Sequence, residues 1–161
     1  MSANKFEPHL IVLPEDDANA ALVNGFLLSP FVNSRQVQVL PVAGGGKRAV
    51  QAFLDEHLIK LRRYTQRRFV LVIDFDNDLT LFERASSQIP NDVKARVFVL
   101  GVFSEPERLR TSLGMGYEDI GKTLTKECIE NRRKLWAHRL LAHNETELAR
   151  LNDSVRQLLF S

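Results

Sequence analysis

Four short apolar runs divide the chain and predict the strands of a sheet. They cover residues 9–13, 36–42, 69–73 and 95–103, which read "HLIVL", "QVQVLPV", "FVLVI" and "ARVFVLGVF". Most residues in these runs are apolar, which is typical of strands buried on both faces. Such strands usually belong to a parallel sheet that is covered by helices.

The segments between these runs predict helices. They cover residues 15–28, 43–64 (beginning with a glycine turn) and 79–89. A further helix is expected to start at Ser104, with Glu107 three residues on in the spacing of a capping box. The tail from Gly121 is helical by composition, with a break near Asn144, which stands three residues before Glu147 in the same spacing.

Alternating strands and helices predict an α/β fold of three layers. We expect a roughly four-stranded, mainly parallel, Rossmann-like sheet with helices on both faces. Residues 8–110 would form the α/β core, and residues 111–161 would form a helical C-terminal extension packed on it. A length of 161 residues without repeats or a linker predicts a single domain over 1–161.

Composition narrows the class of protein further. Hydrophobic residues make up 44% of the chain and charged residues 26%, which is typical of a globular protein. A single cysteine, Cys128, excludes an internal disulfide and fits a reducing compartment. The sequence has no apolar signal region and no apolar run of about 20 residues. We therefore expect a cytoplasmic protein without a membrane partner.

Acidic residues follow three of the four predicted strands. They are Glu15 and Asp16 after the first, Asp74, Asp76 and Asp78 after the third, and Glu105 after the fourth. The carboxyl ends of parallel strands meet at one edge of a sheet, where ligands bind. Crowded carboxylates repel one another unless a cation neutralises them, and hard oxygen ligands suit Mg²⁺ or Mn²⁺. The same acids are also ordinary helix caps and loop residues, so both interpretations stay open.

A glycine turn follows the second predicted strand. Gly44, Gly45 and Gly46 precede Lys47, and Arg48 stands where a Walker A loop would have a hydroxyl residue. One interpretation is a phosphate-binding turn that uses backbone N–H groups and Lys47. The other is a permissive turn between strand and helix.

These motifs together resemble a Toprim-type domain, the α/β module of topoisomerases, bacterial primases and overcoming-lysogenisation-defect nucleases. The matching residues, in order, are Glu15 in "VLPEDDAN", Gly44–Gly46 in "LPVAGGGK", and Asp74 with Asp76 in "VIDFD". The segment "VFVLGVFSEPERL" resembles the fourth strand and the acidic helix start of the nuclease branch. The resemblance covers residues 8–110.

The resemblance implies a magnesium-dependent (or manganese-dependent) phosphodiester-processing protein, most plausibly a nuclease acting on nucleic acid. Asp74 and Asp76 would hold the metal, and Asp78 would assist through water. Glu15 would be the general acid/base or a second metal ligand. Domains of this type often work beside an ATPase or another protein subunit. The chain departs from the pattern at Asp16, where a glycine is usual, and at Asn19, where an acid is usual.

Three alternatives remain. A non-catalytic, partner-binding module of the same fold is favoured by Asp16. The motif "DFDND" is similar to the "DFDGT" of haloacid-dehalogenase phosphatases, although Asp78 stands where a small hydroxyl residue is usual. The opening "LIVLPEDDAN" resembles a response-regulator receiver domain, in which Asp74 would be the phosphoacceptor and Ser104 the switch hydroxyl.

Overall fold

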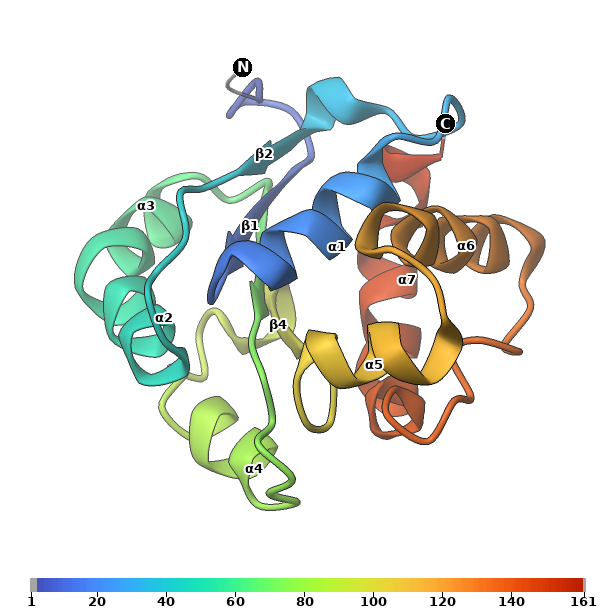
Figure 1. Ribbon diagram of the computed structural model, residues 1–161. Coiled ribbons are helices and arrows are strands. Elements are labelled where there is room, and N and C mark those ends of the chain that lie inside the picture. Colours follow the sequence, from blue (N-terminus) through green and yellow to red (C-terminus); the bar gives the residue numbers. More distant parts are fainter. Residues whose placement is uncertain (1–2, 161) are drawn as a thin grey trace.

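A parallel sheet forms the centre of the protein (Figure 1). The computed structural model describes residues 3–160. Its strands are β1 (His9–Pro14), β2 (Val37–Val39), β3 (Arg67–Val72) and β4 (Val97–Leu100). They lie in the order β2-β1-β3-β4, and each neighbouring pair is parallel. The predicted α/β class and the parallel sheet are therefore confirmed, with β2 and β4 shorter than expected.

Helices cover both faces of this sheet. They are α1 (Asp17–Leu27), α2 (Gly46–Ala52), α3 (Leu58–Arg63), α4 (Leu81–Ser86), α5 (Pro106–Leu113), α6 (Tyr117–Glu130) and α7 (Glu145–Leu159). A single π-helical segment, Phe53–His57, joins α2 to α3. Figure 1 shows α2, α3 and α4 on one side of the sheet and α1, α6 and α7 on the other. Within residues 3–160, none of the helices is long and apolar enough to cross a membrane.

Alternate residues of the strands build the two apolar layers. Ile11, Phe69 and Val99 belong to the cluster that includes residues of α2, α3 and α4. Leu10 and Val70 lie on the opposite face, in the cluster that includes residues of α1 and α7. Because successive side chains of a strand point to opposite faces, continuously apolar strands fill both layers. The sheet therefore lies between two layers of helices, which gives the three-layer arrangement.

Helices α1 and α6 cross with their backbones in contact. A Cβ added at Gly121 would lie 2.4 Å from the carbonyl oxygen of Leu22, and one added at Gly25 would lie 2.5 Å from that of Glu118. The hydroxyl of Thr125 donates a hydrogen bond to the Phe26 carbonyl at 2.6 Å across the same crossing. The absence of a side chain at Gly25 and Gly121 therefore allows these helices to approach so closely.

Two helix starts differ from the predicted ones, and a third lies near Asn144 as predicted but without the expected cap. Glu105, rather than Ser104, occupies the N-cap position of α5, and Ser104 is buried in the loop before it. Helix α6 begins at Tyr117, ahead of the expected Gly121. Asn144 precedes α7, but its side chain makes no capping hydrogen bond.

Asn144 and Glu147 instead bond to the outer edge of β4. The backbone N–H of Val99 donates to Glu147 Oε2 at 2.8 Å, and the N–H of Gly101 donates to Asn144 Oδ1 at 3.1 Å. Asn144 Nδ2 donates to the Gly101 carbonyl at 2.9 Å. A buried backbone group without a partner is costly, and an open sheet edge invites association with other strands. The capping-box prediction was wrong here because these side chains serve the edge strand.

Candidate functional site

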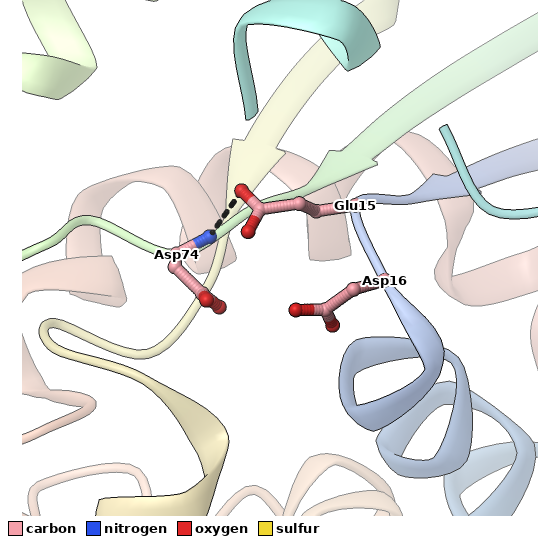
Figure 2. Close-up of side chains that lie close together, drawn as sticks. All are labelled: Glu15, Asp16 and Asp74. Atoms are coloured by element: carbon pink, nitrogen blue, oxygen red, sulfur yellow. Dashed lines mark hydrogen bonds between the residues drawn. The ribbon is translucent and has the colours of Figure 1, made fainter. Parts of the chain in front are cut away.

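The two central strands deliver Glu15 and Asp74 to the same point. In the register of β1 and β3, Pro14 pairs with Val72, and the Glu15 N–H donates to the Val72 carbonyl at 2.9 Å. Glu15 directly follows Pro14, and Asp74 stands two residues after Val72. The Asp74 N–H donates to Glu15 Oε1 at 3.2 Å, the contact drawn in Figure 2. The convergence predicted from the strand ends therefore holds for this pair.

Asp16 completes a cluster of three carboxylates. One carboxylate oxygen from each of Glu15, Asp16 and Asp74 lies within 4.8 Å of the others. Figure 2 shows the side chains pointing toward a shared space at the ends of the strands. Asp16 is held there because it is the N-cap of α1, where its Oδ1 accepts the backbone N–H of Asn19 at 3.0 Å.

Asn19 connects two of these acids, a role that the sequence pattern did not reveal. Its side-chain Nδ2 lies 2.8 Å from Asp16 Oδ1 and 2.8 Å from Asp74 Oδ1. Asn19 is fully buried, so these hydrogen bonds fix the orientation of both carboxylates. The contact with Asp74 bridges 55 positions of sequence. A first-turn asparagine three residues after an N-cap aspartate was the available local signal.

Burial changes the acidity of the cluster. It raises the pKa of Glu15 to about 8, and the neighbouring negative charge of Asp74 adds to this effect. Burial also raises the pKa of Asp74 to about 6; the hydrogen bond from Asn19 opposes that rise, and the charge of Asp16 adds to it. Near neutral pH the cation-free site therefore keeps a proton on Glu15. A bound cation would favour its release.

The other acids predicted for the site do not join this cluster. Asp76 is exposed, with a left-handed backbone (φ 52°). Asp78 accepts hydrogen bonds from the Thr80 N–H at 2.9 Å and from its hydroxyl at 2.8 Å, and it forms an ion pair with Arg84. These partners lower the pKa of Asp78. Glu105 is exposed at the start of α5.

A cleft joins the acids to the glycine turn. Its lining includes Asp74, Asp76 and Asp78 on one side and Gly44, Gly45, Gly46, Lys47 and Arg48 on the other. It encloses about 860 Å³. The predicted phosphate-binding residues therefore face the same space as three of the predicted acids.

Backbone contacts tie the glycine turn to Glu15. The N–H groups of Gly44 and Gly45 donate to the Glu15 carbonyl at 2.8 and 3.3 Å. A Cβ added at Gly46 would lie 2.7 Å from Glu15 Oε1, so this glycine leaves room for the carboxylate. Two of the N–H groups suggested for phosphate binding thus already have a protein acceptor, whereas Lys47 is exposed on the cleft.

Arg110 and Tyr117 are further residues whose relation to the site was not apparent from the sequence. The Arg110 guanidinium lies 4.9 Å from the centre of the Tyr117 ring. Burial raises the pKa of Tyr117, and the charges of Glu107, Asp16 and Asp74 contribute to the rise.

Comparisons of the chain with protein families, with curated proteins and with solved structures found no match. The resemblance to Toprim-type domains accordingly stays a prediction from the sequence motifs. The donor set itself fits a hard divalent cation, because it offers several carboxylate oxygens from three side chains. Both Mg²⁺ and Mn²⁺ suit such ligands.

Proposed function

We propose that the protein is a Toprim-like hydrolase that uses Mg²⁺ or Mn²⁺ to cleave phosphodiester bonds in nucleic acid. The observation that carries this proposal is the convergence of Glu15, Asp16 and Asp74 at the ends of β1 and β3. Two of these three acids, Glu15 and Asp74, are among those that the Toprim resemblance assigns to the site; Asp76, which it also assigns, lies outside the cluster. An adjoining cleft with Lys47 on its wall offers room for a phosphate group.

Each residue has a defined part in this proposal. Glu15 and Asp74 would ligate the cation, with Asp16 as a third ligand and Asp76 on the exposed side of the cleft. A bound cation of this kind polarises the scissile phosphate and lowers the pKa of attacking water. Lys47 would neutralise and orient the phosphate.

If Glu15 does not ligate the cation, it would instead be the general acid/base that moves the proton. A carboxyl group with its pKa raised to about 8 is protonated in part at neutral pH. It is therefore able to serve as a general acid or base near that pH. Asn19 would act as a positioning residue, since it holds Asp16 and Asp74 by hydrogen bonds. The proposal also includes an ATPase or another protein subunit as a partner. This part is supported only by the resemblance to Toprim-type domains.

A cleavage assay tests the proposal. Plasmid DNA, RNA and a small phosphomonoester are each incubated with the protein and Mn²⁺. We expect cleavage of a nucleic acid, and a loss of about 100-fold in Asp74→Asn because a ligand and its charge are removed. The matched control is Asp92→Asn, which removes an equivalent charge from the exposed ion pair with Arg62 and is expected to retain activity.

The outcome with each substrate separates the alternatives. Hydrolysis of the phosphomonoester alone would contradict a nuclease and favour the phosphatase resemblance. A protein that binds Mn²⁺ but cleaves none of the substrates would favour a non-catalytic, partner-binding module. That second candidate is supported by Asn19, which stands in place of the usual acid and already bonds to both aspartates.

A further inference from the structure

An apolar cavity that is partly open to the surface lies between the sheet and the helices α1, α6 and α7. Its volume is about 140 Å³. The walls include Val72 and Leu100 from the sheet, Val23 from α1, Leu124 and Cys128 from α6, and Leu151 from α7. The cavity is separate from the cleft at the acid cluster, which involves the glycine turn and α4.

The cavity separates two apolar clusters on the same side of the sheet. One cluster includes Leu10, Val70 and Val155, between the strands and α7. The other includes Leu22 and Leu124, between α1 and α6. All five side chains line the cavity. Protein interiors are normally packed as densely as organic crystals, so the two clusters leave between them an apolar cavity that the chain's own side chains do not fill.

The accessible wall of the cavity is made of carbon and sulfur. Among the described residues that line it, no polar atom contributes surface to the cavity. Asn144, which belongs to the lining, bonds through its amide to the Gly101 backbone. Val72 and Leu100 keep part of their surface accessible although helices cover this face. A molecule in the cavity would therefore meet apolar surface, and an apolar cavity of about 150 Å³ is large enough to bind benzene or xenon.

We propose that this cavity is a binding site for a small apolar molecule, of the size of benzene or a short branched hydrocarbon group. Burial of the ligand surface against the apolar walls would supply the binding free energy. The inference goes beyond the proposed hydrolase and does not depend on it, because no carboxylate of the acid cluster lines the cavity among the residues described.

Benzene titration of the whole protein tests this proposal. Trp136 lines the cavity and is the single tryptophan of the chain, so its fluorescence reports the occupied state. Benzene at about ten times its Kd is expected to change this fluorescence and to raise Tm by about 3–6 °C. Phenol, of similar shape but polar, is expected to bind more weakly. A wild-type protein that shows neither effect with benzene would overturn the proposal.

Cavity-filling variants locate the site. Val23→Phe from α1 and Cys128→Leu from α6 each add side-chain volume to the void, and each is expected to abolish the benzene-dependent rise in Tm. The matched control is Val42→Phe at an exposed position, where the rise is expected to persist. A rise of equal size in a folded Val23→Phe or Cys128→Leu protein would contradict the location. If neither variant folds, the wild-type titration decides the claim.

Discussion

Glu15 and Asp74 have different chemistry from surface carboxyl groups because they are brought together and partly removed from water. Each would be fully ionised at neutral pH if it were exposed. Burial, with the charge of Asp74 adding to it, raises the pKa of Glu15 to about 8. Burial, with the charge of Asp16 adding to it, raises the pKa of Asp74 to about 6. Such a site holds a proton near neutral pH, and the cation that we propose would displace this proton more easily as pH rises.

The stability of the cation-free protein should therefore depend on Glu15. A carboxyl group whose pKa rises on folding contributes stability fully below its unfolded pKa, near 4.5, and this contribution is lost as pH rises through about 8. We expect the Tm of the wild type, measured with a chelator, to fall relative to that of Glu15→Gln between about pH 5 and about pH 9. Parallel curves for the two proteins would show that Glu15 titrates normally.

Part of the site could be predicted because its residues follow the ends of predicted strands. Glu15 and Asp74 follow adjacent parallel strands, so their proximity was expected from the pattern alone. Asp78 follows the same strand but does not join the cluster. It bonds instead to Thr80 and Arg84, which lie a few residues further along the chain. The role of Asn19 could not be predicted, since its contact with Asp74 depends on how α1 is oriented above the sheet.

At the scale of elements, side-chain spacing predicted helices better than it predicted their caps. Residues 43–64 form helix over most of their length, from α2 to α3, as predicted. The two capping-box spacings failed because a side chain has several possible partners. Asn144 and Glu147 bond to the otherwise open edge of β4, where the N–H groups are buried. The spacing of Asn144 and Glu147 in the sequence does not reveal that their side chains accept hydrogen bonds from β4 and the residue after it.

The crossing of α1 and α6 gives a test at this scale. Replacing glycine by alanine inside a helix normally stabilises it by up to about 1 kcal/mol. Gly121→Ala is expected to do the opposite and to destabilise the protein by about 1–3 kcal/mol, because the new methyl group meets the backbone of α1. Urea unfolding measures the change.

Gly116→Ala is the matched control for this substitution. Gly116 precedes α6 with an ordinary φ of −73°, and a Cβ there would meet nothing within 4 Å. Its effect on the free energy of unfolding is expected to be about 1 kcal/mol or less. Equal effects of the two substitutions would show that the close approach of α1 and α6 does not determine stability.

At the scale of the whole molecule, the two proposed sites lie at different places relative to the sheet. The acid cluster and its cleft lie at the carboxyl ends of the strands, whereas the apolar cavity lies within the layer of α1, α6 and α7. The parallel sheet was predictable because its strands are apolar throughout and alternate with helices. The cavity was not, because it arises from how α6 and α7 pack, and the apolar pattern is the same for filled and unfilled cores.

The most direct test of a cation site at Glu15, Asp16 and Asp74 is anomalous diffraction from a crystal soaked in Mn²⁺ at about pH 8, where the acids release their protons more readily. We expect one anomalous peak at the ends of β1 and β3, with carboxylate oxygens of Glu15 and Asp74 at coordination distance, about 2 Å. An Asp74→Asn crystal soaked in the same way is expected to lack the peak. A wild-type crystal without a peak there would contradict the account.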